Sequence, residues 1–436
     1  MVHPTQILYV SQYYPPEACA PATRVECFAR EWARNGADVG VLTGFPNHPE
    51  GIVHEEYKNY WQRGFMCEER DGVKVYRTWL YPSANRKLWG RGLNFTSFAV
   101  SAAAAGPWVA PRYGVVIATS PQILVGVSGW AVGTLRFLPW VFEVRDLWPE
   151  SLVGVGQADA DSLLYRSVAR VAKFLYRHAS HIVVDGDWKR RHLIHQGVEE
   201  SRITVIRNGI EENFCLDPNS SDAQLARLEV RKELGLRDEF VLLYAGTLGM
   251  AHGWETILHA AERLRDRRDI VFLLMGAGAE RAQICKLIEN LRLANVRLLE
   301  KQPRERIPAY LAAADACLVP LRNKEVFKSA IPSKMFEAMA AGKPAILGVE
   351  GEAKEILLSS QAGLAIPPED PGAMADAILK LRNEPSRCQA LGRNGRQAVL
   401  EKYQRRTEAA KYLSLLGALC ARHKFLATRE PVTLAE

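Results

Sequence analysis

The sequence lacks the features that would tie it to nucleic acid or to an oxidising compartment. Its 8 cysteines are scattered and form no C-x-x-C pair, a pattern typical of a reducing cytoplasm. It has no zinc-finger spacing, no aromatic RNA-binding strand and no long uninterrupted basic run, so we expect no nucleic-acid partner. The net charge of +7 comes from 56 basic and 49 acidic residues, a modest excess that permits an anionic partner without specifying it.

Segments that would enter or cross a membrane are also lacking. Residues 1–20 show no basic start followed by an apolar core, so we expect no secretory signal and a protein that stays in the cytoplasm. The most apolar region, residues 121–144, is interrupted by glycine, proline and Arg136 before about 20 apolar residues accumulate. This interruption favours a buried helix and strand over a membrane span.

A peripheral contact with the inner membrane stays open. Residues 88–108 are apolar and aromatic, and three basic residues lie at their edge: Arg86, Lys87 and Arg91. Such a segment suits a face that meets lipid and a lipid-linked acceptor, whereas a helix buried in the core is the alternative.

The length and the apolar content together predict two domains. The 436 residues, 48% of them hydrophobic, exceed what one compact α/β domain usually holds. In the first half, short apolar runs alternate with helical spacing, which is the pattern of a parallel, doubly wound sheet. The strands expected there are residues 6–11, 39–44, 115–118, 140–144, 181–184 and 204–206. Residues 216–223, LDPNSSDA, are rich in turn formers and mark the break between domains.

The second half restarts the same alternation. The strands expected there are residues 240–245, 270–275, 296–299, 316–320 and 344–348, with helices between them. We therefore predict two Rossmann-like domains, residues 1–215 and 216–400. A C-terminal helix and tail, residues 401–436, would pack back towards the N-terminal domain.

Two glycine-rich turns follow neighbouring strands of the second half. YAGTLGMAHGWETI, residues 244–257, leaves a strand through a loop and opens a helix near Gly253, where the positive helix end would face a phosphate. MGAG, residues 275–278, follows the next strand, and ligands of α/β sheets bind at such strand ends. An ordinary chain reversal is the alternative for both turns. A dinucleotide fingerprint is not met, because no G-x-G-x-x-G occupies the first loop.

The segment SAIPSKMFEAMAAGKPAI, residues 329–346, is the most specific of the motifs. Proline followed by Ser333 would begin a helix there. Glu337 in this helix can accept hydrogen bonds from both hydroxyls of a ribose, and Lys334 can approach a diphosphate. The alternative is that Glu337 only complements the helix dipole.

Two D-x-D triplets, residues 159–161 and 185–187, offer a competing, metal-dependent donor site. The second triplet follows the apolar strand HIVVD, and its acids also suit capping of a helix that begins at Trp188. Because both halves of the chain show Rossmann-like alternation, we favour capping and expect no metal site. Loss of activity with a chelator would reverse this choice.

The order of the motifs resembles glycosyltransferase family 4, and most closely bacterial polysaccharide enzymes of the L-fucosamine-transferase type. The similar segments are, in order, SQYYPPE, EVRDLWPES, RNG at 207–209, YAGTLGMAHGWETI, GAG, IPSKMFEAMAAGKP and GVEGEAKEI. The resemblance implies an α/β fold of the GT-B type, with two Rossmann-like doubly wound domains facing across a cleft. It also implies a retaining, metal-independent transfer of an N-acetylated hexosamine or deoxyhexosamine from a UDP-sugar. The acceptor would be a glycan or a polyprenyl-diphosphate-linked sugar of a surface polysaccharide, such as O-antigen or exopolysaccharide.

The same resemblance implies roles for individual residues. The expected donor-binding residues are Gly246, Thr247, Gly249, His252, Gly276, Gly278, Lys328, Ser333 and Glu337. The expected catalytic residues are Asp146, which would face the reacting sugar, Lys334 and Glu337. The expected acceptor-binding residues are Arg24, which would meet a phosphate, Arg145, and Trp148, which would stack on a sugar.

The chain departs from the family's pattern at several positions. Ser329 stands eight residues before Glu337, where the family often has a glutamate. Thr247 and His252 stand where many members carry an arginine and a lysine for the diphosphate. The candidate substitutes for these cations are Lys328 and Lys334. Arg145 stands where a histidine commonly precedes the acidic residue of the N-terminal domain.

Two other functions compete with transfer. A UDP-sugar 2-epimerase has the same fold and would turn over the nucleotide sugar without any acceptor. A non-catalytic scaffold protein would bind the nucleotide sugar tightly and transfer nothing, and the missing basic positions are compatible with it.

Overall fold

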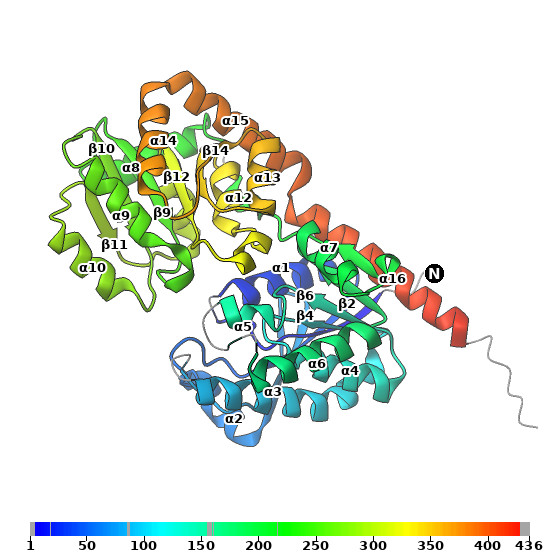
Figure 1. Cartoon of the computed structure of the whole chain (residues 1–436). Coiled ribbons are helices and arrows are strands. Elements are labelled where there is room, and N and C mark those ends of the chain that lie inside the picture. Colours follow the sequence, from blue (N-terminus) through cyan, green and yellow to red (C-terminus); the bar gives the residue numbers. More distant parts are fainter. Residues whose placement is uncertain are drawn as a thin grey trace, which may run out of the picture. The chain divides into compact units, whose positions relative to one another are not determined.

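The computed structural model describes residues 5–427 except 18, 85–87, 155–158, 160 and 216. The chain forms two compact units: unit 1 is Met1–Arg207 with Arg406–Glu436, and unit 2 is Asn208–Arg405 (Figure 1). The sequence-based boundaries, 215/216 and 400/401, lie a few residues from these crossovers. Segment 208–215 stays with unit 2 because the Ile210 amide donates to the Tyr403 carbonyl at 2.8 Å and the Arg405 amide donates to the Ile210 carbonyl at 3.0 Å.

Unit 1 contains an 8-stranded sheet in the order β3-β4-β2-β1-β5-β6-β7-β8. Its strands are β1 Gln6–Val10, β2 Asp38–Gly44, β3 Phe65–Arg70, β4 Val73–Thr78, β5 Val115–Thr119, β6 Trp140–Val144, β7 His181–Val184 and β8 Ile203–Val205. All neighbours are parallel except β3 and β4, an edge hairpin that the sequence did not predict. No residue of β3 is buried, so the strand carries little of the apolar pattern by which buried strands are predicted.

Helices cover both faces of this sheet. They are α1 Ala20–Arg34, α2 Lys58–Arg63, α3 Leu88–Val109, α4 Leu124–Arg136, α5 Glu150–Gly154, α6 Leu163–His178, α7 Asp187–His195 and α16 Arg405–Ala427. Alternate residues of β1 point to opposite faces. Ile7 and Tyr9 pack with α1 and α16, whereas Leu8 and Val10 belong to the core under α3, α4, α6 and α7.

The apolar region at residues 121–144 forms α4 and β6, as predicted from its interruptions. None of the described helices is long and apolar enough to cross a bilayer. Two predicted features fall outside the described residues: the basic pair Arg86 and Lys87, and the middle residue of the 159–161 triplet.

Unit 2 contains a 6-stranded, parallel sheet in the order β11-β10-β9-β12-β13-β14. Its strands are β9 Phe240–Ala245, β10 Ile270–Met275, β11 Val296–Leu299, β12 Ala316–Pro320, β13 Ala345–Gly348 and β14 Gly363–Ala365. Its helices are α8 Ser221–Glu233, α9 Trp254–Arg263, α10 Arg281–Asn290, α11 Ile307–Ala313, α12 Ser333–Ala340, α13 Glu352–Ser359, α14 Pro371–Asn383 and α15 Pro385–Lys402. The strand order reverses direction at β9, so the loops after β9, β10 and β12 lie at the edge where doubly wound sheets bind ligands.

Candidate functional site

The two glycine-rich turns of unit 2 interlock at the carboxyl ends of β9 and β10. Gly276 has φ of +155°, and a Cβ there would lie 1.8 Å from the Gly246 carbonyl oxygen. A Cβ on Gly278 would lie 2.2 Å from the Leu248 carbonyl oxygen. The turns are joined by backbone hydrogen bonds of 2.9 Å from Gly246 N to Met275 O and from Leu248 N to Ala277 O. Glycine is therefore required here by the close approach of two loops, which brings the predicted donor residues Gly246 and Gly276 together.

Lys334 reaches this pair of loops from the start of α12. Its Nζ lies 4.0 Å from the centroid of the Tyr244 ring, and a Cβ on Gly246 would be 3.1 Å from the same Nζ. Among the described residues, this buried Nζ has no hydrogen-bond partner. Burial lowers the pKa of Lys334 to about 8, while the nearby Glu337 carboxylate opposes the shift. A desolvated ammonium held beside the Gly246 turn is a strong site for an anion.

His252 lies next to this cation but does not add to its charge. Its ring centroid is 6.2 Å from that of Tyr244. Burial, with Lys334 as a second cause, lowers the pKa of His252 to about 3, so the imidazole is neutral near pH 7. Nδ1 is buried and has no hydrogen-bond partner in the part of the chain that the structure describes. His252 is thus available for hydrogen bonding, whereas the positive charge comes from Lys334.

Glu337 follows Lys334 by one turn of α12, so both side chains lie on the same side of the helix. Burial raises the pKa of Glu337, and the cations Arg304 and Lys334 oppose that rise. Arg304 is held at 2.5 Å by Glu211, which also accepts from Arg405 at 2.7 Å. Glu337 therefore sits among fixed charges, as a hydrogen-bond acceptor close to the Lys334 site.

The remaining predicted donor residues surround this centre at the surface. Thr247 and Ser333 are exposed, and Gly249 lies at the start of the turn that precedes α9. Lys328 forms a 2.6 Å ion pair with Glu325 and is partly exposed. Of the two lysines considered as diphosphate ligands, Lys334 is thus the one next to the glycine loops.

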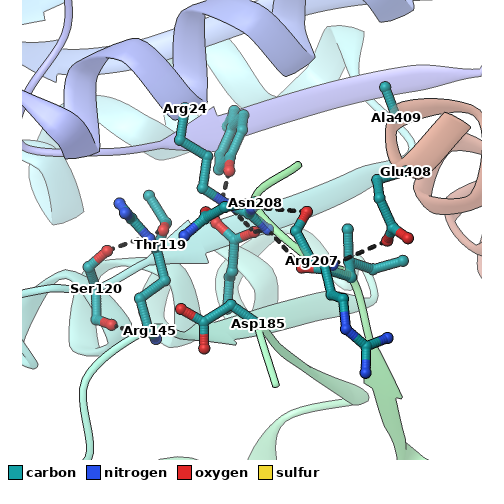
Figure 2. Close-up of polar contacts among 12 residues, drawn as sticks. Arg24, Thr119, Ser120, Arg145, Asp185, Arg207, Asn208, Glu408 and Ala409 are labelled. Carbon is teal, nitrogen blue, oxygen red and sulfur yellow. Dashed lines mark hydrogen bonds and ion pairs between the residues drawn. The ribbon is translucent and has the colours of Figure 1, made fainter. Parts of the chain in front are cut away.

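In unit 1, three of the predicted site residues, Arg145, Asp146 and Trp148, lie in the loop after β6. Ser120, directly after β5, accepts hydrogen bonds from the Arg145 amide at 2.8 Å and the Asp146 amide at 3.3 Å. Figure 2 shows Ser120 beside Arg145. The Trp148 indole donates to the Pro121 carbonyl at 2.6 Å. These bonds fasten the loop after β6 to the loop after β5, and they leave the Asp146 side chain exposed.

The two predicted acceptor arginines differ in their surroundings. Arg24 is 2% exposed; it donates to Glu143 at 2.7 Å and to the Ile206 carbonyl at 3.0 Å. Burial alone would raise the pKa of Glu143, but the Arg24 and Arg145 guanidiniums, with hydrogen bonds from Thr119 and Tyr9, together outweigh it and hold this pKa below its usual value. In contrast, Nε and Nη1 of Arg145 are buried with no hydrogen-bond partner among the described residues. The interior position of Arg24 argues against contact with an acceptor, and Arg145 has the unsatisfied donors.

A polar cluster near β1 and β2 was not predicted. Gln12 donates to Asn94 at 2.5 Å, and Asn94 donates to Asn47 at 3.3 Å. Glu17 accepts the Asn47 amide at 3.0 Å, and burial raises the pKa of Glu17 to about 7. The signal for it was Asn94, the polar residue inside the apolar segment 88–108. All four side chains of this cluster are buried, so it forms a hydrogen-bonded polar interior within unit 1.

The acidic triplet at 185–187 is engaged by cations. Asp185 pairs with Lys189, and Asp187, the first residue of α7, pairs with Arg207. Within the described ranges no group of three or more His, Cys, Asp and Glu lies together as a metal site would require. The expected capping by these acids is wrong in detail, because α7 begins at Asp187 with Gly186 as its N-cap, and no side-chain hydrogen bond caps it there.

The interlocked turns give a stability prediction. We expect Gly276→Ala to lower the free energy of unfolding by about 2 kcal/mol or more, because its Cβ overlaps a carbonyl oxygen and the neighbouring loop must move. Denaturant unfolding measures the change. Gly249→Ala is the matched control, since its φ is −133° and its Cβ meets nothing closer than 3.6 Å. Equal stability of the two variants would contradict the interlock.

The chain matches known families over most of its length. Residues 226–398 match the family model "Glycosyl transferases group 1", and residues 20–209 match "Glycosyl transferase 4-like domain". The putative colanic acid biosynthesis glycosyl transferase WcaI of Escherichia coli is 26% identical over 335 residues, which are 73% of this chain and 77% of WcaI. The probable glycosyltransferase WbjE of Pseudomonas aeruginosa is 29% identical over 354 residues, which are 79% of this chain and 84% of WbjE.

Solved structures share the fold at lower identity. Sucrose-phosphate synthase from Thermosynechococcus elongatus aligns with a TM-score of 0.75 and 23% identity over 96% of this chain and 100% of that chain. Anabaena HepE in complex with UDP-glucose aligns with a TM-score of 0.69 and 17% identity over 94% of this chain and 99% of that chain. At these identities the likeness concerns the fold.

Proposed function

Since the chain belongs to family 4 of the glycosyltransferases, with the GT-B fold, we propose that it moves a sugar from a UDP-sugar to a lipid-linked glycan acceptor with retention of configuration. It is a glycosyltransferase of polysaccharide or glycoconjugate biosynthesis, like the relatives WcaI and WbjE. The donated sugar is proposed to be an N-acetylated hexosamine or deoxyhexosamine, on the resemblance to L-fucosamine-transferase-type enzymes. Transfer is proposed at the cytoplasmic face of the inner membrane, in synthesis of a surface polysaccharide.

The observation that carries the proposal is the unsatisfied ammonium of Lys334 beside the interlocked glycine turns. A nucleoside diphosphate brings negative charge to this position, and the Lys334 charge with the glycine-loop amides would stabilise it. Glu337, one turn along α12, would accept the two ribose hydroxyls. UDP as the nucleotide is supported by HepE, whose structure was solved in complex with UDP-glucose.

The reaction exchanges one bond for another at the anomeric carbon. Its bond to the β-phosphate oxygen breaks, a bond to the acceptor hydroxyl oxygen forms on the same face of the sugar, and the hydroxyl proton leaves with the departing UDP. Negative charge grows on the diphosphate as the sugar becomes oxocarbenium-like. The Lys334 charge would therefore stabilise the transition state more than it stabilises the bound substrate. Because Lys334 and backbone amides supply this positive charge, we propose that no metal ion is required.

On the acceptor side, the unsatisfied guanidinium of Arg145 would meet a phosphate of a polyprenyl-diphosphate-linked acceptor. Asp146 follows it directly and would face the reacting sugar, and Trp148 would offer an aromatic surface to a sugar ring.

The test is a product analysis by NMR with EDTA present. UDP-N-acetylhexosamines and their GDP counterparts are incubated with the chain, with and without a polyprenyl-diphosphate-linked sugar. We expect acceptor-dependent release of UDP and an α-linked product from an α-linked donor. Change of the donor sugar without acceptor would favour the epimerase, and donor binding without any turnover would favour the scaffold.

A further inference from the structure

Helix α3 exposes a continuous apolar stripe. Large apolar side chains are exposed at both ends of the helix and in its middle: Trp89 is 88%, Leu93 53%, Val100 64% and Trp108 84% exposed. Thr96 and Ala104, which fill the gaps, are also exposed. Steps of three and four residues keep these positions on one side of the helix. The opposite side, with Phe98 and Ala102, is buried in the core of unit 1. A helix of this length runs about 33 Å, and the stripe extends along most of it.

The helices beside α3 extend the apolar surface. Figure 1 shows α3, α4 and α6 along one side of the unit 1 sheet, and they pack in that order. Leu135 and Phe137, at the end of α4, are 62% and 83% exposed. Leu163, at the start of α6, is 80% exposed. We call the three helices together the α3/α4/α6 layer.

The charge of this layer has one sign. The three helices contain no Asp or Glu. Their basic residues are Arg91, Arg136, Arg166, Arg170, Lys173 and Arg177. All of these except the partly buried Arg91 are exposed. Six positive charges on three helices nearly equal the net charge of +7 of the whole chain. A surface that is both apolar and purely basic is complementary to an anionic lipid bilayer.

We propose that the α3/α4/α6 layer binds the surface of an anionic lipid bilayer, with α3 lying in the plane of the membrane. Trp89 and Trp108 enter the headgroup boundary at the two ends of α3, where indole rings are favoured, and the cations of α6 meet lipid phosphates. The contact is peripheral, because none of the described helices is long and apolar enough to span a bilayer. This inference rests on the proposed function, since a lipid-linked acceptor would be presented by the same membrane.

A second copy of the chain is a poorer occupant for this surface. A symmetric dimer through the layer would bring the basic residues of both copies to one interface, where like charges repel. Anionic lipid neutralises the same residues. The charge of the layer therefore favours the membrane.

Co-sedimentation of the full chain with vesicles tests the proposal. We expect binding to vesicles of phosphatidylethanolamine and phosphatidylglycerol, weaker binding at high salt, and little binding to phosphatidylcholine alone. The double variant Trp89→Ser/Trp108→Ser should bind at least about tenfold more weakly, because both side chains are fully available for insertion. The double variant Arg170→Glu/Lys173→Glu should lose a similar factor, about tenfold or more.

The control variants lie on unit 2 and replace exposed apolar or basic side chains outside the layer. They are Leu225→Ser/Leu228→Ser on α8 and Arg268→Glu/Lys286→Glu. The controls should bind vesicles as the wild type does. The proposal would be overturned if the layer variants and the control variants lost vesicle binding equally, or if the layer variants bound vesicles as the wild type does. Concentration-dependent dimerisation through the layer, without lipid binding, would also overturn it. UDP titration of each variant separates this outcome from failure of the proposed function: a chain that binds UDP but no vesicle contradicts only the docking surface.

Discussion

Glu337→Ala is expected to weaken UDP binding at least about 100-fold, because two hydrogen bonds from ribose hydroxyls to a carboxylate are lost together. The helix should survive, since alanine is favourable in its interior and Glu337 is only partly buried. Glu337→Gln keeps the size of the side chain and one acceptor oxygen, so its loss should be smaller. Calorimetric titration of the wild type and both variants measures the effect.

A deoxy ligand makes this prediction specific to the ribose. The wild type should lose affinity when UDP is replaced by 2′-deoxy-UDP, whereas Glu337→Ala, which has already lost the contact, should not distinguish the two ligands. An alanine variant that still prefers UDP by the wild-type factor would show that another residue holds the hydroxyl. Glu337 would then be left with its electrostatic role at the helix.

Lys334→Met is expected to lower kcat by about 100-fold to 1,000-fold, since it removes the ammonium beside Gly246 that is proposed to stabilise the departing UDP. Methionine keeps most of the length of the side chain and its packing on Tyr244. Steady-state kinetics with the natural donor measures the loss. Lys328→Met is the matched control and should change kcat less than about threefold, because the Lys328 ammonium is held by an exposed carboxylate.

The pH dependence follows from the lowered pKa of Lys334. In the free enzyme this pKa is about 8, below the ordinary lysine value, so the ammonium is present at pH 7 and is lost as the pH rises through 8. Binding of the diphosphate favours the charged form, so kcat/KM of the wild type should fall above pH 8. The Lys334→Met variant should lack this limb. An unchanged limb in the variant would assign it to another group.

The central strands and helix α12 were predictable from sequence because each carries a local signal. The strands of both sheets are short buried apolar runs, and the segment 329–346 carries its own helix start in Ser333. The turn formers at 216–223 were read as a break between domains. In the structure Ser220 instead accepts the Ala223 amide at 3.2 Å and caps α8, and the chain crosses between units at 207/208. Turn residues and N-caps have the same composition, so the sequence alone did not separate them.

The parts of the site that sequence did not predict depend on distant partners. Nothing local distinguishes Arg24 from Arg145, yet the first is paired with Glu143, 119 positions away, and the second keeps unsatisfied donors. His252 stands where many members of the family carry a cation for the diphosphate. Its burial next to Lys334 makes it neutral, which is a property of the folded site and of no motif.

A crystal of the chain grown with UDP tests the central claim most directly. The account predicts the diphosphate within hydrogen-bond reach of Lys334 Nζ, beside the turns at Gly246 and Gly276, with the ribose hydroxyls on Glu337. UDP bound elsewhere, for example in the basic groove of about 1150 Å³ lined by Lys343 and Arg393 in unit 2, would contradict it.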